Sequence, residues 1–487
     1  MKNVRSQGLC AAARGRFRIL GGSASTRVAR TLAVATLAAG GSPVFAAGFQ
    51  LSETSASGLG NAFAGGAAAA EDASTLWSNP AGLARLGSRQ VAGAIHLITP
   101  SFRFRNDFSA PASQQALGGD GGDAGSLNVV PNLYVAVPLN AQWALGLGVT
   151  APWGLVTDYD DGWIGRFQAD KSDIKTVNVN PGLSFRASSS LSFGIGLNVQ
   201  LIKATFTNQV NYSGALLQAA ALNGITPGSA TYNAIAQATP GLESAAVVKG
   251  DDTGYGWNAG LLWEVAPGQR VGVHYRSAIS YTVAGEATFA NPTPTVTGPL
   301  AATVAALAAG VNGTVLFNTA VTSKVKLPPI VNLSYAGTLD SRIGLMADAQ
   351  WTGWSTIKDL TFVRADGTTL SSTPENFEDV WKLSVGTSYR LDDRWLLRAG
   401  AAYDRSPVQR EYRTPRLPDS DRSFFTLGSQ YRWQPTMWVD VGFGYVKAKE
   451  SAINKSGDPP NVLANGLLNG RYKGSATILS AQLTSSF

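Results

Sequence analysis

The chain has 487 residues, of which 15% are charged, whereas soluble domains typically carry about 25%. Its formal net charge is +7, but residues 1–46 contain seven of the 39 basic residues and none of the 32 acidic ones, which leaves the rest neutral. The basic excess therefore gives no support for nucleic-acid binding. The chain has one cysteine, Cys10, so we expect no disulfide. Its two histidines, His96 and His274, are far apart and have no carboxylate at metal-ligand spacing, so we expect no metal. We also expect no cofactor.

Residues 1–46 have the pattern of a secretory signal peptide. A basic, acid-free start precedes the short apolar run "TLAVATLAAGGSPVFA", which ends at Ala46. The alternative, an uncleaved anchor helix, is disfavoured because Gly40, Gly41 and Pro43 interrupt the run. We predict cleavage after Ala46, which would also remove Cys10.

The next segment, residues 47–89, is rich in glycine, alanine and serine and poor in β-branched residues. Such a segment cannot form a core alone, so it must lie outside, be disordered or fill a space formed by the rest of the chain. Within it, "STLWSNPAGLARL" contains an uncharged corner at Asn79-Pro80-Ala81. Proline fixes its own φ and restrains the residue before it, so the residues alone predict a turn that starts a short helix.

From residue 90 onward the chain is predicted to be an all-β, antiparallel transmembrane barrel. No segment there approaches 18 continuous apolar residues, which excludes transmembrane helices. Segments of about ten residues instead alternate in polarity, as in transmembrane β-barrels. At the C-terminus, Leu479, Ala481, Leu483 and Phe487 share one parity. The fourteen predicted strands are 90–104, 126–139, 142–157, 174–187, 190–209, 250–266, 269–287, 324–338, 342–357, 377–390, 394–406, 421–433, 437–450 and 472–487.

Two predicted outer loops, about 210–249 and 288–323, stand out by their alanine- and leucine-rich stretches with helical spacing. These stretches are interpreted either as loop helices that pack on each other or as an apolar landing surface at the outer mouth, since exposed apolar patches mark binding sites. The two interpretations are compatible.

The third predicted strand contains a proline where the ladder should continue. In "GLGVTAPWGLVTDY", residues 146–159, Pro152 follows Ala151 and lacks the N–H that a ladder needs. A closed barrel has no edge strand to accommodate it. Pro152 therefore predicts a bulge, a kink or a strand end, and an ordinary strand end at a loop is the alternative.

Taken together, several stretches resemble the FadL/TodX family of outer-membrane transporters for long-chain fatty acids and other hydrophobic compounds. The stretches are "AGFQLSETSASGLGNAFAG" (47–65), "AEDASTLWSNPAGL" (70–83), "YGWNAGLLWEVAPGQRVGVHYRS" (255–277), "LPPIVNLSYAG" (327–337), "DDRWLLRAGAAYDRSPV" (392–408), "RLPDSDRSFFTLGSQYRW" (416–433) and "WVDVGFGYV" (438–446). The resemblance implies a barrel of residues 90–487 whose lumen holds an N-terminal hatch, residues 47–89.

The family also implies particular roles for residues of this chain. Ligand would enter between the outer loops, bind inside, and leave sideways through a kink in the third strand, at Ala151 and Pro152. The Asn79-Pro80-Ala81 corner would be the hatch motif on which this gate closes.

Two residues would line the ligand site by the same resemblance. Lys203 falls where the family has a basic residue facing the pocket, and Phe49 would line the pocket wall. A second basic position of the family falls near Thr373, so Arg364 or Lys358 would have to replace it.

We therefore expect a monomeric outer-membrane channel of a Gram-negative bacterium, surrounded by membrane lipid, for passive uptake of long-chain fatty acids. The first alternative is the same channel for aromatic or alkane hydrocarbons. A general porin is disfavoured because residues 47–89 would plug it. An outer-membrane hydrolase would need a nucleophile near a base, and neither His96 nor His274 lies in a recognisable motif, so no enzymatic activity is expected.

Overall fold

A computed structural model describes residues 48–455 and 463–487, which belong to one compact unit. The predicted signal peptide, residues 1–46, and its cleavage site lie outside the described residues. No helix within the described residues is long and apolar enough to cross a membrane.

Strands make up most of the described chain. The strand segments are β1 (Gln90–Asn106), β2 (Asn128–Pro138), β3 (Trp143–Thr150), β4 (Gly154–Asp158), β5 (Lys171–Arg186), β6 (Leu191–Asn211), β7 (Glu243–Ala266), β8 (Gln269–Arg276), β9 (Ile279–Ala290), β10 (Thr319–Leu327), β11 (Ile330–Thr338), β12 (Ile343–Thr352), β13 (Asp359–Arg364), β14 (Thr369–Pro374), β15 (Val380–Arg390), β16 (Trp395–Asp404), β17 (Arg422–Gln434), β18 (Met437–Ala448), β19 (Ser451–Asn454) and β20 (Asn469–Ser486). The helices are α2 (Ala56–Gly60), α3 (Gly66–Ala69), α4 (Thr75–Ser78), α5 (Tyr212–Leu222), α6 (Ala230–Ala238) and α7 (Ala301–Thr314), with 3-10 turns η1 (Pro80–Arg85), η2 (Gly298–Leu300) and η3 (Trp354–Thr356).

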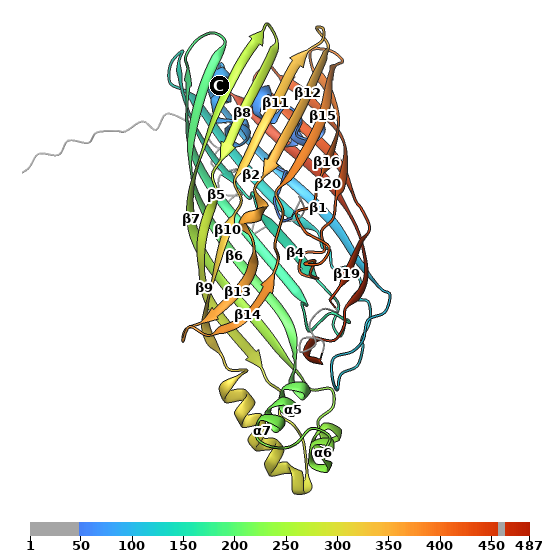
Figure 1. The fold of residues 1–487 in the computed structure, drawn as a ribbon. Coiled ribbons are helices and arrows are strands. Elements are labelled where there is room, and N and C mark those ends of the chain that lie inside the picture. The colour runs from blue at the N-terminus through green and yellow to red at the C-terminus, as the bar shows by residue number, and fades with distance from the viewer. Residues whose placement is uncertain (1–47, 456–462) are drawn as a thin grey trace, which may run out of the picture. The chain divides into compact units, whose positions relative to one another are not determined.

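The twenty strand segments form one closed antiparallel barrel of fourteen wall strands, as predicted. Six wall strands are interrupted and consist of two successive segments: β3 with β4, β8 with β9, β10 with β11, β12 with β13, β14 with β15, and β18 with β19. The barrel closes because β1 pairs with β2 on one side and with β20 on the other. Figure 1 shows the strands tilted around a common axis.

Alternation along each strand separates a lipid face from a lumen face. On β6, the apolar side chains of Phe193, Ile195 and Leu197 are exposed, whereas the intervening Ser192 and Asn198 are buried. The period of two in the sequence produces this division, because successive side chains point to opposite sides of the sheet. An apolar outer surface and a polar lumen are what a barrel in a bilayer requires.

The two ends of the barrel differ in the length of their connections. Short turns such as 139–142 and 391–394 lie at one end, and long loops such as 212–242 and 291–318 lie at the other. In outer-membrane barrels the short turns are periplasmic and the long loops extracellular. The helices α5, α6 and α7 pack on each other in the long loops around a shared apolar cluster, and they lie at the opposite end from the C-terminus (Figure 1).

The N-terminal residues 48–89 lie inside the barrel, and we call them the hatch. Their four short helical turns contact inward-facing positions on strands all around the wall, including β3, β6, β8, β16 and β17. At two of these positions only glycine fits: a Cβ at Gly272 would lie 1.9 Å from the carbonyl oxygen of Ala67, and one at Gly400 would lie 2.2 Å from the carbonyl carbon of Asn61. The wall is therefore shaped to accept the hatch backbone.

Candidate functional site

The third wall strand is interrupted at Ala151-Pro152-Trp153, between β3 and β4. Thr150 pairs with Asn178 and Gly154 pairs with Lys175, so three residues of the interrupted strand face two residues of β5. Pro152 cannot donate to the ladder, which forces the bulge at this point.

A polar side chain on β5 stabilises the bulge. The hydroxyl of Thr176 accepts from the Trp153 N–H at 3.0 Å and donates to the Trp153 carbonyl at 2.8 Å. The Thr176 N–H also donates to the Trp153 carbonyl, at 3.2 Å, so the buried side chain adds to this backbone contact and supplies the acceptor for the Trp153 N–H.

On its other side the same break interrupts the wall itself. β2 pairs with β3 only from Leu133 to Pro138, and within the described part of the chain no ladder joins β2 residues 128–132 to β4. Farther along, the Asp158 N–H at the end of β4 donates to the Ala124 carbonyl at 3.0 Å, so the wall lacks backbone hydrogen bonds only locally, beside the Pro152 bulge.

The first residues of the hatch cover this break from the inside. The Leu51 N–H donates to the Pro152 carbonyl and the Gly154 N–H donates to the Phe49 carbonyl, both at 2.8 Å. A third contact ties the segment to β2, since the Asn132 amide donates to the Glu53 carbonyl at 2.9 Å. Residues 49–53 thus occupy the position of the missing strand pairing.

An apolar cluster lies directly behind the break, and we call it the inner cluster. Its centre is aromatic: the ring of Phe49 lies 5.9 Å from Trp153 and 5.1 Å from Trp354, and Phe377 lies 5.9 Å from Trp354 between ring centroids. The other buried members are Leu155, Ile202, Ile279, Tyr281, Val283, Leu327, Ile330, Val380, Val408 and Leu417. The predicted pocket residue Phe49 lies in this cluster, whereas Trp354, from the break between β12 and β13, had no signal in the sequence.

A partly buried cation lies at the edge of the inner cluster. Arg416 precedes Leu417, a cluster member, and its guanidinium lies 5.3 Å above the ring of Phe206. Its polar contacts are long, 3.5 Å to the Lys171 carbonyl and 3.5 Å to the Asn208 amide oxygen. Among the described residues Arg416 has no ion-pair partner.

The Arg416 guanidinium keeps its charge at neutral pH. Burial lowers its pKa only to about 10, and the acidic groups whose charges act on it are Glu375 and Asp170. The edge of the cluster therefore carries a cation.

The structure does not place Lys203 at this site, and the prediction is corrected. Lys203 pairs with Lys175 and Asp251 and is exposed, whereas its neighbour Ile202 is buried in the inner cluster. Because successive strand residues alternate between faces, Lys203 points outward from the wall.

The three residues considered for the second basic position also lie away from the inner cluster. Thr373 pairs with Leu360 in the β13–β14 hairpin, Arg364 donates to the Val315 carbonyl at 2.8 Å, and Lys358 is exposed.

The Asn79-Pro80-Ala81 corner is a fixed point inside the hatch. The Asn79 side chain is fully buried; its oxygen accepts from the Ala81 N–H at 3.0 Å, and its amide donates to the carbonyls of Ala67 at 2.7 Å and Leu261 at 2.9 Å. Leu261 belongs to β7, so the corner fastens the hatch to the wall away from the Pro152 break. That the gate at Pro152 closes on this corner stays a prediction.

We expect Asn79→Ala to loosen the hatch without preventing folding. The change removes the side-chain partner of two buried carbonyls and of one N–H, and leaving a buried polar group unsatisfied costs about 1–3 kcal/mol. The unfolding temperature of the purified barrel should fall, and uptake or leak should rise. An unfolding temperature equal to that of the parent would contradict this role.

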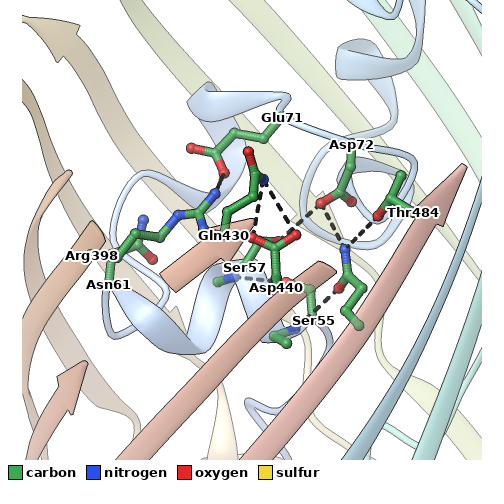
Figure 2. Close-up of polar contacts among 12 residues, drawn as sticks. Ser55, Ser57, Asn61, Glu71, Asp72, Arg398, Gln430, Asp440 and Thr484 are labelled. Atoms are coloured by element: carbon green, nitrogen blue, oxygen red, sulfur yellow. Dashed lines mark hydrogen bonds and ion pairs between the residues drawn. The ribbon is translucent and has the colours of Figure 1, made fainter. Parts of the chain in front are cut away.

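A buried polar network holds the other side of the hatch (Figure 2). Arg398 on β16 pairs with Asp440 on β18 at 2.6 Å and with Glu71 of the hatch at 2.8 Å. Close by, Gln482 on β20 donates to Asp72 of the hatch at 2.9 Å. The hatch body is therefore fastened to two wall strands, β16 and β20, by charged or charge-assisted contacts, and Arg398 is also tied to β18 through Asp440.

The two histidines take no part in this chemistry. His96 is buried with its Nδ1 2.6 Å from the Ser480 hydroxyl, and His274 is buried near Asn258. Within residues 48–455 and 463–487, no group of three potential ligands could hold a metal ion.

Comparison with known proteins gives one consistent family. The sequence model described as "Outer membrane protein transport protein (OMPP1/FadL/TodX)" matches residues 37–487. The long-chain fatty acid transport protein of Escherichia coli K12 is 29% identical over 444 residues, covering 88% of this chain and 94% of that protein. The 47 kDa outer membrane protein of Pasteurella multocida Pm70 is 31% identical over 449 residues, covering 89% and 95%.

Solved structures agree with this assignment. A FadL homologue of Pseudomonas aeruginosa superposes with a TM-score of 0.79 at 26% identity, over 91% of this chain and all of that one. The toluene transporter TodX of P. putida, with a TM-score of 0.60 at 18% identity over 85% and 94%, shares the fold. With its closed barrel, its break at Pro152 and a match along nearly the whole chain, this protein belongs to the OMPP1/FadL/TodX family of outer-membrane transport proteins.

Proposed function

We propose that this protein is a passive outer-membrane channel for long-chain fatty acids, and that it releases them sideways through the wall at Pro152. The observation that carries the proposal is the inner cluster, an apolar site that adjoins both a wall break and a partly buried cation. The name of the Escherichia coli relative supports this substrate class. In this proposal the channel acts as a monomer and catalyses no reaction.

The physical chemistry of the ligand favours a sideways exit. Burying each methylene group stabilises an acyl chain by about 0.8 kcal/mol, so passage into water would be costly. The hatch body lies inside the barrel and is fastened to its wall by the Arg398 network, so it stands in the way of a ligand that would continue along the lumen. A ligand that leaves through the break passes directly into the bilayer core.

Phe49 connects ligand binding with opening in this proposal. Its ring occupies the centre of the inner cluster, while its carbonyl accepts from Gly154 beside the break. An acyl chain that takes the place of the ring would pull residues 49–53 away from the break, because ring and backbone belong to the same residue.

Arg416 is the proposed partner of the ligand carboxylate, in place of Lys203. We expect Arg416→Gln to weaken oleate binding to the purified barrel about tenfold or more, since a hydrogen bond to a charged group contributes about 1.5–3 kcal/mol. Binding of a neutral alkane should change little. The matched control is Lys203→Gln, which removes a cation from the outer face. Equal oleate affinity in parent and Arg416→Gln would contradict the fatty-acid assignment.

Aromatic hydrocarbons are the second candidate substrate. The rings of Phe49, Trp153 and Trp354 could contact a flat ligand edge-to-face as they contact each other. This candidate would be favoured if the barrel bound toluene with an affinity equal to or higher than that for oleate, and if Arg416→Gln left the toluene affinity unchanged.

A further inference from the structure

A group of exposed basic residues lies on the outer face of the barrel near its extracellular end. Arg103 and Arg105 on β1 and Arg471 and Lys473 on β20 have side chains that are 71%, 58%, 44% and 73% exposed. Each follows the outward parity of its strand. We call these four residues the seam patch, because β1 and β20 form the seam that closes the barrel.

The strand register places like charges directly opposite each other in the seam patch. Arg103 is the cross-strand partner of Lys473, and Arg105 is the partner of Arg471. Like charges that face each other across a ladder are destabilising. Two successive pairs of this kind, at the ladder that closes the barrel, concentrate positive charge at one place on the outer face.

Acidic residues neutralise part of this charge. Asp123 accepts from Arg103 at 3.1 Å, and Asp107 accepts from Arg471 at 2.9 Å and lies 3.7 Å from Arg105.

Glu450 completes the acidic set. It lies 3.3 Å from Arg471 and 3.9 Å from Lys473. One further base, Lys447 on β18, points outward opposite Ser475. Five bases thus face three acids, and the excess charge is positive.

The height of the seam patch relative to the bilayer points to its ligand. The exposed apolar side chains Leu97 and Leu479 lie opposite each other on the lipid face, and Tyr445 on β18 is exposed at the level of Thr477. Arg103 lies six residues beyond Leu97, or about 20 Å along the strand. The patch therefore begins where the apolar surface ends, at the level of the outer-leaflet headgroups.

We propose that the seam patch binds the phosphate groups of a phosphorylated lipid in the outer leaflet. Arginine presents several N–H donors in a planar fork that matches phosphate oxygens, and basic clusters at a membrane surface bind anionic headgroups. A headgroup with two phosphates could place one near each like-charged pair. The site is independent of the transport route, because its side chains face away from the lumen.

The test compares a fourfold variant of the seam patch with a matched control. The variant is Arg103→Gln, Arg105→Gln, Arg471→Gln and Lys473→Gln. The control is Lys203→Gln, Lys249→Gln, Lys324→Gln and Lys326→Gln, which removes four bases from outer-face positions away from the seam, where Lys324 and Lys326 face Thr282 and Ser280. Binding of fluorescent diphosphoryl lipid A is measured on each full barrel in detergent micelles.

We expect the fourfold variant to bind at least about tenfold more weakly than the parent, since each base near a membrane surface adds to the attraction of anionic headgroups. The control should stay within about twofold. Equal binding in parent and fourfold variant would overturn the proposal. Oleate binding should be unchanged in both, so failure here is distinguishable from failure of the transport proposal.

A second measurement identifies the source of the phosphate and does not depend on the variant folding. Lipid A should raise the unfolding temperature of the parent, because a bound anion relieves the like-charge pairs at the seam. A dephosphorylated lipid A should not. If inorganic phosphate raises it as much as lipid A does, or if the dephosphorylated lipid is as effective, the lipid assignment is wrong. Should the fourfold variant fail to fold, the pairs Arg103→Gln/Lys473→Gln and Arg105→Gln/Arg471→Gln replace it.

Discussion

Closing the wall at Pro152 should strongly reduce uptake of hydrophobic compounds while leaving their binding intact. The change is Pro152→Val combined with deletion of Ala151. Three residues of the third strand now face two of β5, so deleting one restores equal numbers, and valine restores the missing N–H. A regular ladder to β5 would then continue and extend toward β2. We expect oleate uptake in cells to fall at least about tenfold, because the exit through the wall is closed. Binding should survive, because the ligand enters through a different opening.

The measurement requires matched surface levels and a matched control. Pro181→Val changes another wall proline, on β5 opposite Leu147, outside the break. It should leave uptake unchanged. Oleate affinity of the sealed barrel should stay within about threefold of the parent, since the inner cluster is retained. If the sealed barrel imports oleate as fast as the parent, release does not occur at Pro152 and the lateral route is wrong.

Much of the barrel could be predicted because its physics is periodic. A strand that faces lipid on one side and the lumen on the other must alternate, and the segments around Leu197 and Leu479 do so clearly. Pro152 was informative for a related reason: a closed barrel offers no edge at which a missing N–H is harmless. Both signals follow from local chemistry that the sequence carries directly.

The interruptions in wall strands seven to ten were not predicted. Residues 269–287 and 342–357 were expected to be continuous strands, but the structure breaks them at Ser277-Ala278 and after Thr352. The residues next to these breaks, Ile279 and Trp354, enter the inner cluster. A break whose reason is packing across the lumen depends on partners distant in sequence, so no local pattern marks it.

The error at Lys203 had a local signal that was outweighed by family resemblance. Lys203 has the same parity as Leu197 and Val199, which face lipid, and opposite parity to the lumen-facing Gln200. Strand alternation alone would have placed it outside. Arg416 could not be found this way, because it lies in the long segment between β16 and β17, which has no period.

Removing the cation of the hatch network should have the largest effect on the stability of the closed channel. The Arg398 side chain is 1% exposed and is the shared partner of Asp440 on the wall and Glu71 on the hatch. In Arg398→Met two carboxylates remain near each other without their cation. Breaking a buried pair in this way typically costs about 3–5 kcal/mol. The hatch would lose its charged contact with β16, and Asp440 would favour hydration over burial.

We therefore expect Arg398→Met to unfold at lower temperature and to conduct ions in planar bilayers, whereas the parent stays closed. The control, Arg394→Met, changes an exposed arginine in the turn before β16 and should alter neither property. A double variant, Arg398→Met with Asp440→Leu, removes the wall charges together and should recover part of the stability, since well-packed apolar replacements of buried ion pairs are often tolerated. Conductance that remains at the parent level in Arg398→Met would mean that the Asn79 corner and the Gln482 contact suffice to hold the hatch, and that the lumen is blocked without the ion pair.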